Sequence, residues 1–498
     1  MAGIDTRSYR TSFLGYARRS SQAALNSRTG AKLRNIADVW VRADLHNTFG
    51  RDNPRILVTL FVAIAVSLVS AHPWPGDDLL RDMVAWHYSY DYRNMFAYSP
   101  GIPTYDMYIG FDVVTGWVYR HFPWGSHQSG TFVVQCCATI AYLAAVTHAV
   151  IKRARSSDDK WFLTAALLVA VLLAGSANRL MLARPEIFLA AWAICATAIE
   201  SRKGLLIWTA GGALLLTSYW MALAYLPLVA TAKRPLWERG LAALTLLKLN
   251  LVFWIAYSHG AWLGTGELLR HSVATRLVPI GEDMPIALML FSVPVDILLL
   301  SLAAATWHRF SHTQPDSERR RLFWELAILA GIIIWFLLPN MIRYADIVGP
   351  LLAIALATIW PVQSPLPWTA LARGMVLLTA TLLGFGLFQA SDQTDTVLLQ
   401  DPPTHVVLTP FGPPMYRLIF SNPGVVVAPA MEVGFSTVPV QHLTVDLNNG
   451  TLDCSALTRL KFTDVLEDSL KSIPPCATLE DISHTLRLWK LQPGPAAK

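Results

Sequence analysis

Long apolar runs recur along the chain between residues 56 and 390, and short polar stretches separate them. A helix of roughly 20 apolar residues crosses a bilayer, and shorter runs cross when the bundle buries their ends. The pattern therefore predicts an α-helical polytopic membrane protein with about eleven transmembrane helices. The expected spans are 56–71, 131–150, 161–178, 186–199, 205–217, 219–232, 241–258, 285–306, 324–338, 347–361 and 375–390.

The positions of the basic residues predict how the bundle is oriented. Arg and Lys crowd into residues 1–55 and into alternate short loops, such as the cluster at 319–321. Cytoplasmic loops carry an excess of these residues, so the N-terminus is expected inside a bacterial inner (cytoplasmic) membrane. Alternation of the spans then leaves two long loops, 72–130 and 259–284, on the outer side.

The chain from residue 391 to 498 is more polar and predicts a small α/β domain outside the cytoplasm. Strands are expected at 405–409, 425–428 and 438–447, and Thr463 and Thr478 are expected to begin helices. If this domain faces an oxidising compartment, Cys454 and Cys476 can form a disulfide. The chain thus divides into a basic segment 1–55, a transmembrane domain 56–390 and a C-terminal domain 391–498.

Composition supports this organisation and excludes one class of partner. Hydrophobic residues make up 53% of the chain and charged residues 15%, whereas soluble proteins carry about 25% charged residues. The net charge of +6 comes from the N-terminal segment and short loops, as the orientation rule requires. We therefore expect membrane lipids as partners and no nucleic acid.

The first outer loop holds the most informative polar group. Gly76-Asp77-Asp78 follows the first span, and Arg81 and Asp82 come one turn later. Apolar positions over 79–87 and 109–117 predict two helices that lie along the membrane surface. The loop is also rich in Trp and Tyr, which is typical of an interfacial belt or of a groove that stacks sugars.

This arrangement resembles the GT-C superfamily of membrane glycosyltransferases. The resemblance implies a polyprenyl-phosphate-linked sugar as donor and a lipid, glycan or protein as acceptor on the outer face. It also implies inverting transfer, with Asp77 and Asp78 as catalytic base or metal ligand and Asp82 as a weaker candidate. A divalent cation (Mg²⁺, Mn²⁺ or Ca²⁺) suits such carboxylates, although the sequence does not require one.

When the sugar is transferred, the polyprenyl phosphate leaves with negative charge and needs cations near the membrane interface. Charged residues at membrane depth are costly and usually functional. Arg184 begins the fourth span from the outside, and Glu186 follows it, placed to orient Arg184 or a sugar hydroxyl. The predicted substrate- and phosphate-binding residues are Arg81, Asp82, Arg184, Glu186, Arg343 and Tyr344.

Each of these residues also has a structural interpretation. Asp77 and Asp78 can cap the helix that begins at Leu79. Arg184 and Glu186 can pair inside the bundle, and Arg343 can anchor at the interface.

Other functions remain open at this stage. An O-antigen-type ligase or polymerase would use residues of loop 259–284, such as His271 and Arg276. A transporter or flippase would use a polar residue within a span, such as Asp296. A scaffold would bind partners through the C-terminal domain.

Overall fold

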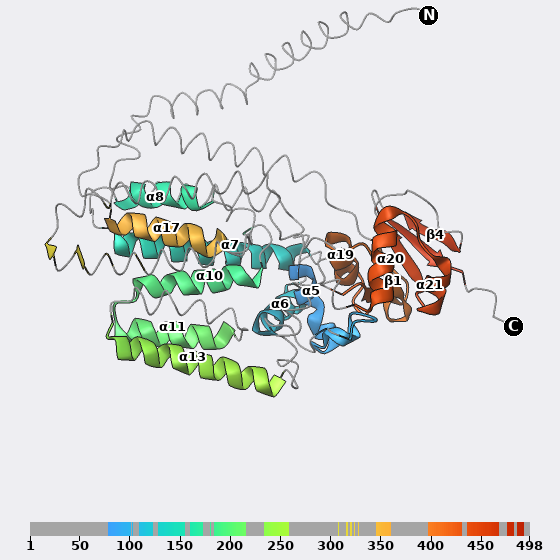
Figure 1. The fold of residues 1–498 in the computed structure, drawn as a ribbon, viewed down its shortest axis with the longest axis horizontal. Helices are drawn as coiled ribbons and strands as arrows, with labels where there is room; N and C mark the ends of the chain where they lie inside the picture. The colour runs from blue at the N-terminus through green and yellow to red at the C-terminus, as the bar shows by residue number, and fades with distance from the viewer. Residues whose placement is uncertain are drawn as a thin grey trace, which may run out of the picture.

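In a computed structural model, the described part of the chain is mostly helical and ends in one five-stranded sheet (Figure 1). The helices lie side by side in a bundle, and the sheet lies beyond one end of that bundle. The structure describes residues 78–100, 102, 109–122, 128–154, 160–172, 180, 184–215, 234–257, 307, 315–316, 319–320, 323, 327, 345–359, 397–430, 436–467, 476–482 and 486–492.

Six bundle helices fall on predicted spans. They are α7 (Gln128–Arg153), α8 (Lys160–Val171), α10 (Pro185–Cys195), α11 (Arg202–Leu215), α13 (Leu236–Tyr257) and α17 (Ala345–Ile359). One helix of the described chain, Gly130–Arg153, is long and apolar enough to cross a membrane, and Pro185–Ala198 and Gly349–Ile359 are shorter apolar helices. The predicted spans 56–71, 219–232, 285–306 and 375–390 and nearly all of 324–338 lie outside the described residues.

Helices α7 and α10 form the centre of the bundle and run in the same direction. At their last turns Arg153 is buried, and its Nε donates a hydrogen bond to the carbonyl oxygen of Thr197 (2.9 Å). Lys152 pairs there with Glu200. Helix α17 packs against α7, α8 and α10, and the side chains from Leu351 to Ala357 are buried. The last turn of α7 thus carries two basic side chains, Lys152 and Arg153.

A pair of tryptophans joins α10 to α11. The rings of Trp192 and Trp208 stack at 4.0 Å, and each indole N–H donates to the other residue's carbonyl oxygen. The ring of Trp192 fits this space because Gly211 and Gly212 leave room for it on α11. Two buried indole N–H groups are thereby satisfied without any polar side chain.

Large apolar side chains remain exposed along the bundle. They include Phe132 and Ile140 of α7, Leu206 and Ile207 of α11, and Trp237, Leu241 and Leu244 of α13.

The C-terminal sheet has the order β2-β1-β3-β5-β4. Its first three strands are parallel, and β5 pairs antiparallel with both β3 and β4. Its elements are η7 (Pro402–Thr404), β1 (Val406–Leu408), α19 (Pro413–Ser421), β2 (Val426–Ala428), α20 (Val438–Asn449), α21 (Cys454–Arg459), β3 (Asp464–Glu467), β4 (Ala477–Ile482) and β5 (Arg487–Leu491). Cys454 and Cys476 are joined by a disulfide, which ties α21 to the start of β4.

Three sequence-based predictions for this domain are wrong. Residues 438–447 form a helix, because Val440, Leu443 and Leu447 are buried at helical spacing. Thr463 and Thr478 precede or lie in strands β3 and β4 instead of beginning helices.

The first loop contributes α5 (Asp78–Val84), η1 (Ala85–Tyr88), η2 (Tyr92–Asn94) and α6 (Ile109–His121). Helix α6 exposes Val113, Val114 and Trp117, as a surface helix would. Helix α5 is different, since every side chain described from Leu79 to Val84 is buried. The prediction that α5 lies along a surface is therefore wrong: it packs between α6 and α19 of the C-terminal domain.

Candidate functional site

The predicted loop 72–130 is called the acidic loop below. The candidate site lies where its described part, the bundle and the C-terminal domain meet (Figure 1). Asp78 is the first residue of α5. Asp77 and the side chain of Asp78 lie outside what the structure describes, so their contacts stay predictions. The structure does describe what holds the rest of α5 in place.

Arg81 and Asp82 form a buried ion pair on α5. The guanidinium donates from Nε (2.8 Å) and Nη2 (2.6 Å) to Asp82 Oδ1, and the two residues are 4% and 0% exposed. Charge-assisted bonds of this kind are among the strongest in proteins. Because both charges are used inside the fold, this geometry favours a positioning role over the predicted direct contact with substrate.

A second carboxylate, Asp112 of α6, belongs to the same cluster. The hydroxyl of Tyr92 lies 3.3 Å from Asp82 Oδ1 and 3.1 Å from Asp112 Oδ2, and all three residues are buried. The phenol thus links α5 to α6 through two acidic side chains. Sequence reasoning missed Asp112 and Tyr92. The only local signal in the sequence is that the carboxylate of Asp112 interrupts the apolar helix predicted over 109–117.

Aromatic rings cover the guanidinium of Arg81. Its Cζ lies 5.1 Å from the ring centroid of Tyr92 and 5.9 Å from that of Tyr416. A cation over a ring face is attracted by the ring quadrupole, most strongly where water is excluded. Tyr416 belongs to α19, so the C-terminal domain supplies part of this cluster.

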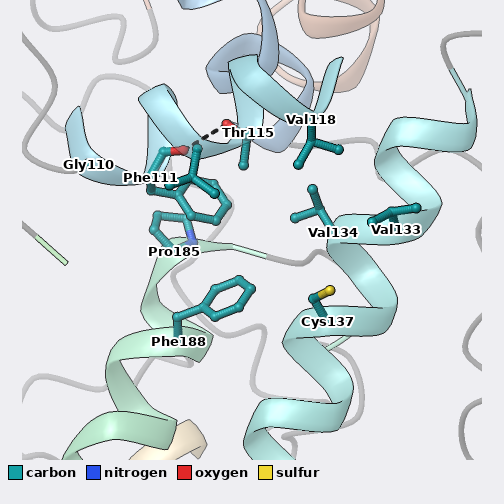
Figure 2. A pocket seen from close by; sticks show the side chains of 10 residues that line it. Gly110, Phe111, Thr115, Val118, Val133, Val134, Cys137, Pro185 and Phe188 are labelled. Atoms are coloured by element: carbon teal, nitrogen blue, oxygen red, sulfur yellow. Dashed lines mark hydrogen bonds between the residues drawn. The ribbon is translucent and has the colours of Figure 1, made fainter. Parts of the chain in front are cut away.

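An apolar cavity of about 180 Å³ lies on the other side of α6. Figure 2 shows side chains from α6, α7 and the start of α10 surrounding it. The lining residues are Gly110, Phe111, Val114, Thr115, Val118, Val133, Val134, Cys137, Pro185 and Phe188. The hydroxyl of Thr115 donates to the backbone oxygens of Phe111 and Asp112, so it adds little polarity to the wall.

Arg184 and Glu186 flank Pro185 at one edge of this cavity. Arg184 is the N-cap residue of α10, and Pro185 occupies the first turn, where its missing N–H costs nothing. Glu186 Oε2 is buried without a hydrogen-bond partner among the described residues. The predicted pairing of Glu186 with Arg184 stays a prediction. Arg343 and Tyr344, predicted for the same site, lie outside the described residues.

The described residues contain no group of three or more His, Cys, Asp or Glu side chains placed to hold a metal ion. Asp82 Oδ1 is already held by Arg81, so this oxygen does not suit a cation as the structure stands. Loop 259–284, with His271 and Arg276, is outside the described residues.

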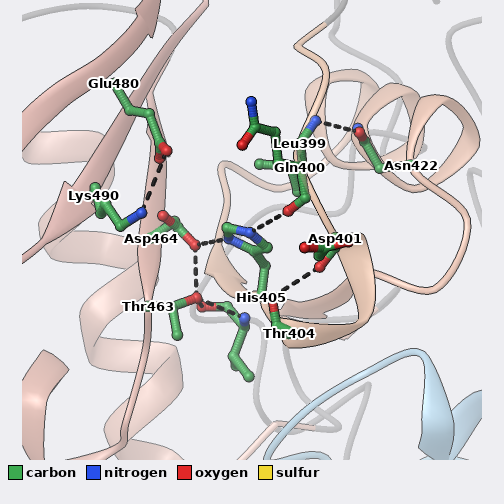
Figure 3. A network of polar contacts seen from close by, with 11 residues as sticks. Leu399, Gln400, Asp401, Thr404, His405, Asn422, Thr463, Asp464, Glu480 and Lys490 are labelled. Carbon is green, nitrogen blue, oxygen red and sulfur yellow. Dashed lines mark hydrogen bonds and ion pairs between the residues drawn. The ribbon is translucent and has the colours of Figure 1, made fainter.

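A separate polar network fixes the beginning of the C-terminal domain (Figure 3). His405 Nδ1 lies 2.6 Å from Asp464 Oδ2, and its Nε2 lies 2.8 Å from the carbonyl oxygen of Gln400. Asn422 accepts from the backbone N–H of Leu399 and donates to the carbonyl oxygen of Val397. These contacts attach residues 397–405 to β3 and to the end of α19.

No protein-family model matches the sequence, and no curated protein is significantly similar to it.

Proposed function

We propose that this protein is a polytopic membrane glycosyltransferase of the outer face of a cytoplasmic membrane. It would transfer a sugar from a polyprenyl-phosphate donor to a lipid, glycan or protein acceptor. The observation that carries the proposal is the position of α6, which has an apolar cavity on one face and a buried carboxylate cluster on the other. In this proposal the lipid chain would occupy the cavity on one face of α6, and the carboxylate cluster would hold the opposite face.

The cavity has the size and lining for part of a hydrocarbon chain. An apolar cavity of roughly 150 Å³ stays dry and binds a molecule such as benzene. At about 180 Å³, this one would take a short segment of an isoprenoid. Helix α7 is long enough to cross a bilayer, and the exposed apolar side chains of α7, α11 and α13 favour a lipid surround for the cavity.

The chemistry assigns one step to each group. A carboxylate of Asp77 or Asp78 takes the proton from the acceptor hydroxyl, a contribution of about 10²–10⁴-fold. The acceptor oxygen bonds to the anomeric carbon as the bond from that carbon to the phosphate oxygen breaks, which inverts the configuration. The polyprenyl phosphate leaves with the bonding electron pair. Arg184, the N-cap residue of α10 next to the cavity-lining Pro185, would be the cation that stabilises this phosphate.

A divalent cation at Asp77 and Asp78 stays a prediction. The Arg81–Asp82–Tyr92–Asp112 cluster fixes the helix that Asp78 begins. In this proposal its members are positioning residues, and Asp77 and Asp78 are the groups that touch substrate.

Cys137 provides a direct test, because its thiol lines the cavity and is exposed. In a Cys136→Ala/Cys195→Ala background, a maleimide should alkylate Cys137. Undecaprenyl phosphate should slow the alkylation in a saturable manner, whereas a detergent of equal chain length should not. The alkylated protein should lose transfer activity, and Cys137→Ala in the same background should keep its activity after identical treatment.

Two results would count against the proposal. Labelling of Cys137 that is indifferent to undecaprenyl phosphate would show that the cavity does not take the lipid. Uptake of a lipid-linked sugar into sealed vesicles without any new glycosidic bond would favour a flippase.

A further inference from the structure

The hydroxyl of Tyr88 joins the acidic loop to the C-terminal domain. It donates to the carbonyl oxygen of Val425 (2.7 Å) and accepts from the backbone N–H of Gly424 (2.9 Å). Tyr88 is 5% exposed, and burial raises the pKa of its phenol, so the hydroxyl keeps its proton and can make both bonds. These partners are 336 and 337 positions away in the sequence.

The backbone of the same loop extends the sheet. The N–H of Ala97 donates to the carbonyl oxygen of Val427 (2.9 Å), and the N–H of Val427 donates to the carbonyl oxygen of Met95 (3.0 Å). Phe96 therefore forms a parallel bridge with Val427 on the free edge of β2. The loop closes this edge, which would otherwise leave unpaired backbone groups.

Packing around α5 also connects the acidic loop to the C-terminal domain. Helix α5 lies between α6 and α19, and Tyr416 of α19 stands over the guanidinium of Arg81. On the loop side, a ring nitrogen of His87 would lie 3.2 Å from a Cβ built at Gly424. The C-terminal domain therefore supplies one of the helices that pack against α5.

We propose that the C-terminal domain is a positioning element for the acidic loop, with Tyr88 as the positioning residue that couples the two. The catalytic consequence rests on the proposed glycosyl transfer, because α5 begins at Asp78. Loss of the coupling would let α5 and its first residue move relative to α6 and the cavity. Turnover would fall, whereas binding of the lipid chain, which uses α6, α7 and α10, would change little.

The test compares Tyr88→Phe with Tyr98→Phe in the full-length protein in detergent. Tyr98 is in the same loop, and its ring packs on Phe462, but its hydroxyl makes no hydrogen bond to a described residue. Removing the Tyr88 hydroxyl leaves the partly buried N–H of Gly424 and the carbonyl of the buried Val425 without this partner. Amide exchange in 79–97 and 424–428 should therefore rise by roughly tenfold or more. Tyr98→Phe should match the wild type.

Steady-state transfer with a polyprenyl-phosphate sugar supplies the second readout. Tyr88→Phe should lower kcat several-fold and leave the KM for the donor within about twofold. Exchange equal to that of Tyr98→Phe would overturn the coupling. Faster exchange with unchanged kcat would overturn the positioning role. The exchange measurement needs no substrate, so an inactive wild type would contradict the proposed function and leave this coupling test decisive.

Discussion

The number of residues between Cys454 and Cys476 predicts how much their disulfide stabilises the C-terminal domain. The two residues are 22 positions apart, and the bond joins the first residue of α21 to the residue before β4. In the chain-entropy description, closing a loop of this length restricts the unfolded chain by about 3 kcal/mol at 25 °C. The double variant Cys454→Ala/Cys476→Ala should lose about that much.

The loss should appear locally, because β4 is an edge strand that pairs only with β5 among the described strands. Amide exchange of β4 and β5 in the full-length protein should speed up by on the order of a hundredfold, since 1.4 kcal/mol corresponds to tenfold. Cys136→Ala/Cys195→Ala, which removes two free thiols of the bundle, is the matched control and should leave β4 unchanged.

The same bond tests on which side of the membrane the domain lies. In intact cells, Cys454 and Cys476 should resist a maleimide until a reductant is added, because a disulfide persists in an oxidising compartment. Exchange in β4 within about threefold of wild type would refute the stabilisation, because even a loss of about 2 kcal/mol corresponds to about thirtyfold faster exchange. Free thiols at both positions in unreduced cells would refute the outer location.

Three further predictions concern packing and the acidic cluster. Gly212→Ala should destabilise the contact of α11 with α10 by about 1–3 kcal/mol, because its Cβ would overlap the ring of Trp192. Gly240→Ala on α13 is the control: its Cβ meets open space, so the substitution should be neutral or stabilising. Thermal unfolding in detergent compares the two variants. Gly424→Ala should speed proteolysis of the acidic loop more than Gly412→Ala does. Both glycines have positive φ (102° and 108°), but only a Cβ at Gly424 would contact His87 and Pro403. Equal effects of the two substitutions would mean that backbone strain alone is responsible. Tyr92→Phe should cost about 1–3 kcal/mol of stability, because it removes a buried hydroxyl shared by Asp82 and Asp112; a denaturation midpoint equal to that of Tyr98→Phe would contradict the shared bond.

Local patterns predicted the helices of the bundle well, because apolar runs there are uninterrupted and their ends are marked by polar residues. The same patterns failed over 438–447. There Pro439 at the start and Gly450 just past the end (φ 72°) bracket a helix, although the dipeptide Asn449-Gly450 is also a common hairpin turn. A turn signal and a helix C-cap both need a residue that tolerates positive φ, so the dipeptide alone does not distinguish them.

The candidate site was only partly visible in the sequence. The acidic start of α5 and the charged residues before α10 could be found, because carboxylates and arginines beside apolar runs are unusual. Tyr92 with Asp112, and Tyr88 with Val425, could not be paired, because only tertiary packing brings them together. The burial of Arg81 with Asp82 likewise depends on α19, which lies more than 300 positions further along the chain.

The most direct test of the central claim is glycosyl transfer by the purified full-length protein with Asp77→Asn and Asp78→Asn as separate variants. Radiolabelled polyprenyl-phosphate sugars serve as donors and an envelope lipid extract as acceptor. Asp91→Asn, in the same loop but paired with the exposed Arg93, is the matched control. At least one of Asp77→Asn and Asp78→Asn should lose about 10²–10⁴-fold in kcat with wild-type folding, while Asp91→Asn keeps full activity. Full activity in both Asp77→Asn and Asp78→Asn would contradict the account.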